Sequence, residues 1–293
     1  MRIDAHIHFW RPECGFDNKP IADHPAYRRD FLPQDIEGEL AHRGIEAVIL
    51  VQAAPQVDET AWMLELARRH PVIAGVVGWV DLDAAPVDYV ALCADRRLVG
   101  IRAQLRRIAD PQFILRPRVL DNVARAIEAG LGVTLLTEQR HYAAVERALR
   151  LLPPGPITFN HLGMRFPEVD AGQWRNLMRV IVERPATFLQ LSGLPFLHGQ
   201  QWREPPARAI LDEAYGLVGP GRLVFASDWP MLLRFATYGD WVNAVEALLH
   251  AHGATATESD AVFCHNAIAS QPRLVAPGGR ASSLPLPNTE NAR

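Results

Sequence analysis

Short apolar runs rich in valine, isoleucine and leucine alternate along the chain with segments whose apolar residues recur at helical spacing. Runs of this kind are typical of buried parallel strands, and the segments between them are typical of connecting helices. The pattern predicts strands at residues 2–8, 46–52, 72–80, 98–104, 132–137, 157–161, 187–192 and 223–228. It predicts helices at residues 33–43, 59–69, 87–94, 118–129, 143–151, 173–183, 206–216 and 238–250.

Eight strands that alternate with helices favour a closed (β/α)8 TIM barrel over a doubly wound sheet. No GxGxxG motif follows a predicted strand, which argues against a dinucleotide-binding fold. Glycines 44, 130 and 216 are expected to end helices in a left-handed conformation. Without an internal repeat or linker, residues 1–275 are interpreted as a single barrel domain. Residues 276–293, rich in Pro, Gly, Ser and Asn, are interpreted as a flexible tail.

Composition narrows the class of protein. A hydrophobic fraction of 48% with 22% charged residues is typical of a soluble globular protein, and a net charge of −3 argues against a nucleic-acid binder. No apolar run is long enough to span a membrane, and polar residues interrupt the apolar N-terminus, so no signal peptide is expected. The three separated cysteines form no CxxC pair and indicate reduced thiols in a cytoplasmic protein.

Lysine is almost absent from the sequence, and Lys19 lies in a loop rich in Pro and Asp. A lysine on a barrel strand is needed both for Schiff-base catalysis and for a lysine carbamate that bridges two metal ions. The sequence therefore excludes both of these chemistries.

The strongest local motif is the pair His6 and His8 on the first predicted strand. Side chains two residues apart on a strand share a face, so both imidazoles can point into the barrel near its C-terminal mouth, where barrel enzymes have their active sites. Two neighbouring neutral imidazoles suit a divalent metal ion. The HxH pattern also arises by chance from surface histidines, so it does not decide the matter alone.

Two further polar residues end predicted apolar strands: His161 the sixth and Asp228 the eighth. A buried aspartate is uncommon unless it is paired or hydrogen-bonded. Each residue has a structural alternative, in which His161 bonds to the backbone and Asp228 caps the following turn. Because all four residues fall on the face predicted to hold the active site, we interpret His6, His8, His161 and Asp228 as one reaction centre.

These motifs resemble the metal-dependent hydrolases of the amidohydrolase superfamily. The closer resemblance is to the lactonase branch, which contains sugar-lactone hydrolases and pyrone-dicarboxylate lactonases. It rests on the stretches HIHFW, RDFLP, GWVDL and SDWP, which begin at His6, Arg29, Gly78 and Ser227. The resemblance implies hydrolysis of a small-molecule lactone of a sugar acid or related carboxylic acid. In that reaction Asp228 is the general base, and the three histidines stabilise the oxyanion directly or through a metal ion.

Departures from the family pattern limit the metal content. Two-metal members of the superfamily carry a lysine on the fourth strand and a histidine on the fifth, where this chain has Arg102 and Glu138. The resemblance therefore implies one zinc-like divalent ion, bound by His6, His8, His161 and Asp228, or none. Relatives usually have Asp before the histidine of the sixth strand, where this chain has Asn160.

Substrate-binding candidates surround the predicted mouth. Arg102 and Arg106 can form a fork for a carboxylate or hydroxyls. Trp10 and Trp79 can form walls for a sugar ring, and Glu138 can reach the mouth from the fifth strand. Arg106 as a solvated loop charge and the tryptophans as packing residues are the structural alternatives.

The same four central residues also suit a decarboxylase of this superfamily, and a barrel that binds a sugar acid without turnover is a third alternative. Nothing in the sequence indicates the oligomeric state.

Overall fold

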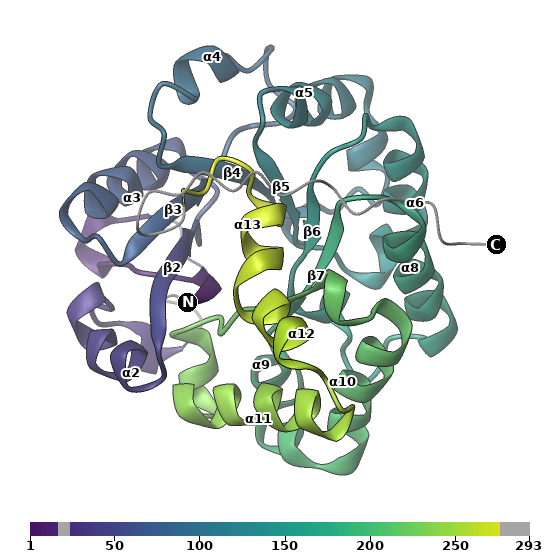
Figure 1. The fold of residues 1–293 in the computed structure, drawn as a ribbon. Coiled ribbons are helices and arrows are strands. Elements are labelled where there is room, and N and C mark those ends of the chain that lie inside the picture. Colours follow the sequence, from purple (N-terminus) through teal and green to yellow (C-terminus); the bar gives the residue numbers. More distant parts are fainter. Residues whose placement is uncertain (17–23, 276–293) are drawn as a thin grey trace.

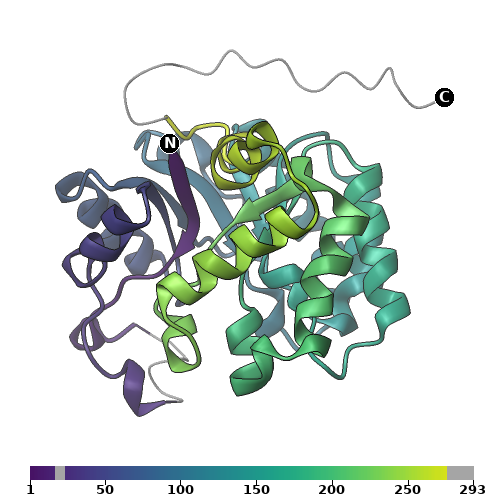
Figure 2. The same ribbon diagram turned by 60° about the horizontal axis from the view of Figure 1, so that its bottom comes forward.

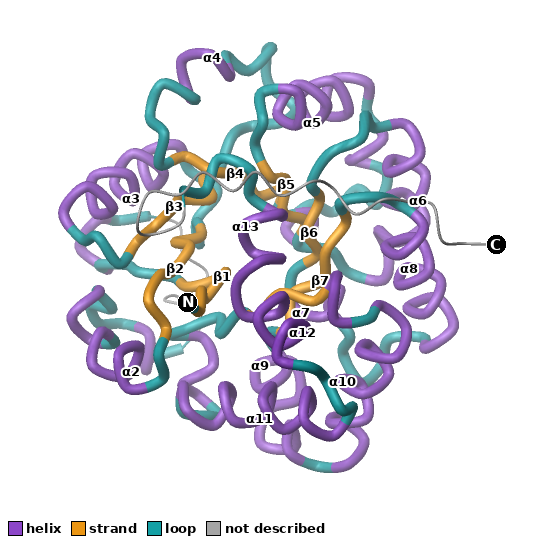
Figure 3. The backbone as a smooth tube through the Cα atoms, viewed as in Figure 1, coloured by secondary structure: helices purple, strands orange, loops and turns teal. Residues whose placement is uncertain are grey.

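The computed structural model describes residues 1–16 and 24–275. Its strands form one parallel eight-stranded sheet in the order β1 to β8, and a parallel bridge between Ile7 and Trp229 brings β8 back to β1. Figures 1 and 3 show the resulting ring of strands with helices around it, so the predicted (β/α)8 barrel is confirmed. The strands are β1 (Arg2–Ile7), β2 (Ile45–Val51), β3 (Ile73–Gly78), β4 (Leu98–Ala103), β5 (Gly132–Leu135), β6 (Ile157–Phe159), β7 (Thr187–Leu191) and β8 (Leu223–Phe225).

Helices cover the outer face of the barrel, and Figure 2 shows several of them from the side. They are α2 (Glu37–His42), α3 (Val57–Arg69), α4 (Tyr89–Leu92), α5 (Pro117–Glu128), α6 (Tyr142–Leu151), α7 (His161–Met164), α8 (Ala171–Glu183), α9 (Leu194–His198), α10 (Pro205–Val218), α11 (Tyr238–Ala251), α12 (Ala256–Asp260) and α13 (Asn266–Ser270). Each predicted helix has a counterpart, although the segment 33–43 is a 3-10 turn at Pro33–Asp35 followed by α2. The prediction for Gly216 was wrong, because α10 continues past it and the positive φ of 75° falls on Gly219.

Two apolar layers hold the barrel together. The outward side chains of the strands, such as Leu50 and Ile101, pack against the surrounding helices. The inward side chains near the strand starts, such as Ile3 and Val99, pack against residues of the C-terminal helices, among them Ala267. Alternation of side chains along each strand produces these two layers.

The segment after residue 255 closes one end of the barrel. It comprises α12, a π-helical turn at Ala261–His265 and α13, and α13 contacts β1, β7 and β8. Figure 1 shows α13 across the middle of the ring, on the side where β1 begins. The periodicity analysis missed these helices, although Thr255 and Glu258 form a capping box at the start of α12. Among the described residues, this leaves the opposite end, where the strands finish, as the entrance for a ligand.

All eight strands end earlier than predicted, and at three of them this moves a central residue out of the strand. β1 stops at Ile7, β6 at Phe159 and β8 at Phe225, so His8, His161 and Asp228 follow the strands rather than close them. His161 and Asp228 have positive φ values of 50° and 60°, which lie in the left-handed region and cannot continue a strand. Non-glycine residues in this region are often found at functional sites, where the surrounding structure holds them in place.

The predicted tail at 276–293 lies outside the described residues, and the domain limit at residue 275 stays a prediction. Over the described ranges, no helix combines the length and apolar character required to cross a lipid bilayer.

Candidate active site

The junction between β1 and β8 brings the central residues together. The backbone N–H of Asp228 donates to the carbonyl of His6 over 2.9 Å, and the N–H of His8 donates to Trp229 over 2.7 Å. A β-bulge lies in β1, where Asp4 to Ile7 oppose only Val48 to Leu50 of β2. The extra residue separates the faces of Asp4 and His6, which would otherwise be shared.

His6 and His8 point at each other inside the barrel, as predicted from their spacing. Their Nε2 atoms are 3.1 Å apart, and both side chains are buried. On the far side of each ring, Nδ1 of His8 lies 2.7 Å from the carbonyl oxygen of Val51, and Nδ1 of His6 lies 2.9 Å from Oε1 of Gln190. Both partners are acceptors, so Nδ1 carries the proton in each ring and each Nε2 presents a lone pair.

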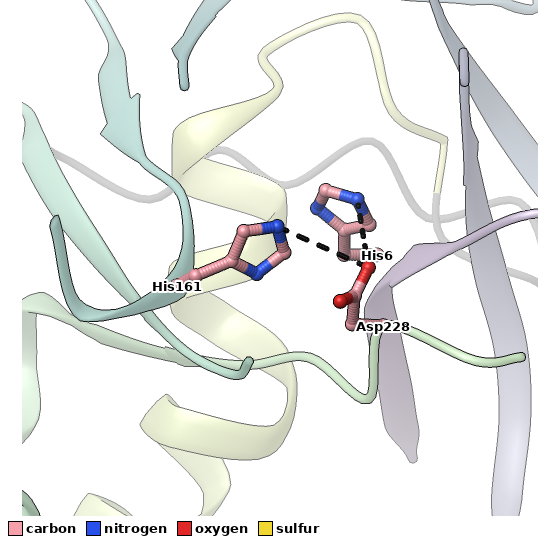
Figure 4. Close-up of side chains that lie close together, drawn as sticks. All are labelled: His6, His161 and Asp228. Carbon is pink, nitrogen blue, oxygen red and sulfur yellow. Dashed lines mark ion pairs between the residues drawn. The ribbon is translucent and has the colours of Figure 1, made fainter. Parts of the chain in front are cut away.

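Asp228 and His161 complete the group, and Figure 4 shows the side chains of His6, His161 and Asp228 directed toward one another. Oδ1 of Asp228 lies 3.3 Å from Nε2 of His8, 3.7 Å from Nε2 of His6 and 3.9 Å from Nε2 of His161. The prediction that these residues lie together agrees with this geometry, which unites residues from three separate strand ends.

A left-handed turn presents His161 to the site. His161, Leu162, Gly163 and Met164 all have positive φ values. Two buried side chains hold this turn, because Tyr142 Oη donates to the carbonyl of Gly163 and Trp174 Nε1 donates to that of Leu162. At its other side, Nδ1 of His161 lies 2.9 Å from Oγ of Ser192, directly after β7. The imidazole is therefore fixed by contacts on both sides.

The protonation states follow from burial and from the neighbouring charges. Burial lowers the pKa of His161 to about 4, and burial and then Arg102 hold the pKa of His6 well below its ordinary value. Burial alone would raise the pKa of Asp228, but His161, the His8 hydrogen bond and Arg102 together lower it. His6 and His161 are therefore neutral at neutral pH, and Asp228 is ionised.

These groups fit a divalent cation. His6, His161 and Asp228 offer ligand atoms within 4.8 Å of one another, and Nε2 of His8 is close to two of them. The lone pairs of His6 and His8 face each other and the Asp228 carboxylate, an arrangement that is repulsive unless a cation lies among them. Neutral imidazole nitrogens and carboxylate oxygens are ordinary zinc ligands in proteins.

A cavity of about 500 Å³ opens above this group at the C-terminal ends of the strands. Among the described residues that line it, Asp228 is the single carboxylate, whereas four arginines contribute guanidinium groups. The lining residues are His8, Trp10, His24, Tyr27, Ala53, Arg102, Gln104, Arg106, Arg107, Leu136, His161, Met164, Phe196, Asp228, Met231 and Arg234.

Arg102 is the most buried of these arginines, with 5% of its surface exposed. Its Nε donates to Oδ1 of Asn160 and its Nη1 donates to the carbonyl of Gln52, each over 2.9 Å. Both acceptors are neutral, and burial lowers the pKa of the guanidinium to about 10, so it stays charged. A buried cation with neutral partners at a cavity wall favours an electronegative group of a ligand.

The other substrate-binding candidates separate into two groups. Trp10 and Arg106 line the cavity, and their contact with substrate stays a prediction. Trp79 and Glu138 are not among its lining residues. β3 ends at Gly78, and the N–H of Trp79 donates to Thr60 Oγ1, which turns the chain toward α3. Glu138 forms ion pairs with Arg106 and Arg140 at the edge of the mouth. Of these two partners, Arg106 lines the cavity, so Glu138 acts on the cavity by holding Arg106.

Sequence reasoning missed several residues of the site. Gln190 and Ser192 contact the histidines, and His24, Tyr27 and Arg234 line the cavity. The available signal for Gln190 and Ser192 was a polar residue in or directly after an apolar strand, because β7 is otherwise apolar after Thr187. For His24, Tyr27 and Arg234, which lie outside the strands, the sequence contains no comparable signal of a place in the cavity.

Comparisons with known proteins agree with this geometry. Residues 3–269 match the family model described as Amidohydrolase. An L-fucono-1,5-lactonase of Burkholderia ambifaria is 33% identical over 254 residues, which cover 83% of this chain and 86% of the relative. An L-fucono-1,5-lactonase of Burkholderia multivorans is 31% identical over 268 residues, covering 84% of this chain and 88% of the relative.

A solved structure adds a fold comparison. The crystal structure of an amidohydrolase from Burkholderia multivorans with bound zinc superposes with a TM-score of 0.82 and is 28% identical. The match covers 93% of this chain and 99% of that one, so nearly the whole described barrel has a counterpart there.

Proposed function

The chain belongs to the amidohydrolase family, and we propose that it is a lactone hydrolase whose reaction centre is formed by His6, His8, His161 and Asp228. One observation carries the proposal: these four residues lie together, three of them lining a cavity, in a chain that is similar to two curated lactonases. The resemblance found in the sequence is confirmed at the level of the family. L-Fucono-1,5-lactone and other sugar-acid lactones are the first substrates to test.

Asp228 is the proton acceptor in this proposal. Its carboxylate is ionised at neutral pH and faces the cavity, where it can take a proton from the water that attacks the lactone carbonyl. Collapse of the tetrahedral intermediate breaks the ring C–O bond. The protonated carboxyl of Asp228 then returns its proton to the departing ring oxygen, and the product is the hydroxy acid. One water molecule is consumed for each ring opened.

The histidines provide the place for one divalent cation, with zinc as our first choice because of the donor types. When bound, such a cation polarises a carbonyl oxygen and lowers the pKa of water. His6 and His8 contribute through Nε2, since their Nδ1 atoms are occupied by Gln190 and Val51. The chain lacks the lysine that two-metal relatives use, so we propose no more than one ion.

Arg102 and Arg106 are proposed to orient the substrate, with Trp10 as a wall of the cavity. Arg102 can donate to the lactone carbonyl, to ring hydroxyls or to the carboxylate of the product. Trp10 is held by the hydrogen bond from its Nε1 to the carbonyl of Tyr27, and it presents an apolar face against which a sugar ring can pack. Given their positions, we assign no substrate contact to Trp79 or Glu138.

The test is proton release from a panel of sugar-acid and dicarboxylate lactones, with the wild type and the Asp228→Asn variant, before and after chelation. We expect acid release from at least one sugar-acid lactone, and loss of this release in the variant. A parallel measurement of carbon dioxide from aromatic carboxylic acids tests the decarboxylase alternative, which the lactonase relatives make less attractive. Carbon dioxide release without lactone opening would overturn the proposal, and binding of a lactone without turnover would indicate a non-catalytic barrel.

A further inference from the structure

We propose that Asn160 and Gln190 are positioning residues that fix His6 in the tautomer with its proton on Nδ1, and that Arg102 sets the direction of this hydrogen-bond chain. The inference rests on the proposed metal site, because only this tautomer leaves Nε2 of His6 free to bind a cation. The chain joins the cavity wall at Arg102 to His6 through two side-chain amides.

Arg102 sets the donor-to-acceptor direction of the hydrogen-bond chain, because its guanidinium has donors but no acceptor. Its Nε lies 2.9 Å from the Asn160 side chain, so the atom that Asn160 presents there must be the acceptor Oδ1. Asn160 consequently turns its Nδ2 to the other side, where it donates to Oε1 of Gln190 over 2.7 Å.

The orientation of the Gln190 amide determines which nitrogen of the His6 imidazole carries the proton. Its Oε1 accepts from Asn160, and its Nε2 donates to the carbonyl of Ala5 over 3.3 Å, so both ends of the amide are assigned. The same Oε1 lies 2.9 Å from Nδ1 of His6, and this contact is favourable only when Nδ1 carries the proton. Asn160 Nδ2 and His6 Nδ1 lie 3.1 Å apart because both donate to one oxygen.

Burial makes the orientation of the two side-chain amides energetically important. The side chains of His6, Asn160, Gln190 and Arg102 are all buried, so solvent offers no substitute partner when one amide turns round. A reversed amide would place two acceptors or two donors against each other, which is costly in a buried site. The tautomer of His6 is therefore tied to the identity of the two amides.

Two substitutions of Gln190 give opposite expectations. In Gln190→Leu, the acceptor that faced Nδ1 of His6 is removed, and Asn160, still held by Arg102, has its Nδ2 3.1 Å from that atom. Nδ1 of His6 must then accept from Asn160. The imidazole proton moves to Nε2, the atom that faces His8 and Asp228, and cation affinity falls.

In Gln190→Glu, the new carboxylate accepts from both Asn160 Nδ2 and His6 Nδ1, so the tautomer is retained. Only the contact with the carbonyl of Ala5 becomes repulsive, which affects stability rather than the imidazole. Gln190→Glu adds one negative charge near the site, whereas Gln190→Leu adds none. A purely electrostatic effect would leave the cation affinity of Gln190→Leu unchanged, whereas the hydrogen-bond chain predicts a decrease.

The experiment measures zinc affinity and imidazole tautomer without any lactone, so its outcome is independent of the proposed reaction. Zinc affinity of the metal-free wild type, Gln190→Leu and Gln190→Glu is measured by competition with a chromogenic chelator. Nitrogen-15 spectra of histidine-labelled, metal-free protein report the tautomer, with the His6 signals identified by their loss in His6→Gln. Circular dichroism checks that each variant is folded.

We expect the Nδ1–H tautomer of His6 in the wild type and in Gln190→Glu. In Gln190→Leu we expect the Nε2–H tautomer and a zinc affinity lower by about 10- to 100-fold, the usual effect of disturbing a group that orients a metal ligand. An Nε2–H tautomer in the wild type would overturn the proposal, and so would equal zinc affinities and unchanged tautomers in both variants. If Gln190→Leu does not fold, the spectra of the wild type and Gln190→Glu still decide the question.

Discussion

A Cβ atom on Gly193 would lie 2.5 Å from the Cβ atom of His161. Gly193 also has a positive φ of 76°, and it follows Ser192, whose Oγ contacts the His161 imidazole. The absence of a side chain at position 193 is therefore a condition for the position of His161.

Gly193→Ala should impair both stability and turnover. The left-handed conformation alone costs a residue with a Cβ about 1–2 kcal/mol, and the contact with His161 adds to this cost. Because the imidazole must shift, we expect turnover of a lactone substrate to fall by about 100-fold. Urea unfolding and steady-state kinetics measure the two effects.

Gly38→Ala is the matched control, since a Cβ at this position in α2 meets no other atom within 4 Å. We expect unchanged turnover and a gain of roughly 0.5–1 kcal/mol in unfolding free energy, because alanine is the better helix former. Equal activities of the two variants would contradict the role assigned to Gly193.

Asp228→Asn should abolish hydrolysis and leave the fold intact. Asparagine has the same shape and tolerates the positive φ of 60° at this position, but its amide cannot take a proton from water. We expect the turnover number to fall by about 100- to 10,000-fold, the usual contribution of a general base. Proton-release kinetics and circular dichroism separate loss of chemistry from loss of structure, and a fully active variant would remove Asp228 from its role.

Removal of divalent cations should lower both activity and thermal stability. In our proposal zinc binds the folded arrangement of His6, His161 and Asp228, which would stabilise the protein by about 2.7 kcal/mol at a concentration 100 times its dissociation constant. Chelation followed by titration with zinc, monitored by thermal melting, measures this directly. An unchanged melting temperature across the titration would show that the four groups act without a cation.

The sequence predicted the barrel well because the alternation of apolar strands with helices is a local property of the chain. The same holds for His6 and His8, whose common orientation follows from strand geometry alone. The bulge that turns Asp4 away from them left no mark in the sequence. It depends on the pairing of β1 with β2 and on the closure against β8.

Other parts of the site depend on contacts between distant positions. Gln190 contacts His6 across 184 residues, so a glutamine inside an apolar strand was the only trace available. The left-handed turn at His161 is held by Tyr142 and Trp174, neither of which is near the site in sequence. Propensity rules favour other conformations for such residues, and tertiary contacts override them here.

Asp4 should make stability depend on pH in an unusual direction. Its buried carboxyl accepts from the N–H groups of His6 and Ser227 and from Tyr238 Oη, yet burial outweighs these bonds and raises its pKa from 3.8 to about 6. Between these two pH values the folded state binds more protons at Asp4 than the unfolded state. The contribution of Asp4 to unfolding free energy therefore decreases as pH rises through this window, by about 3 kcal/mol.

Asp4→Asn isolates this effect, because the amide has no proton to lose and its Nδ2 can donate to the Tyr238 oxygen in place of the bond it loses. Relative to the wild type, we expect the variant to become more stable as pH is raised from 4 to 7, with most of the change below pH 6. Urea unfolding of both proteins at pH 4, 5, 6 and 7 gives the difference directly, and effects common to both chains cancel. A difference that is constant over this range would mean that Asp4 has the same pKa in the folded and unfolded states, and that its hydrogen bonds from His6, Ser227 and Tyr238 fully compensate its burial.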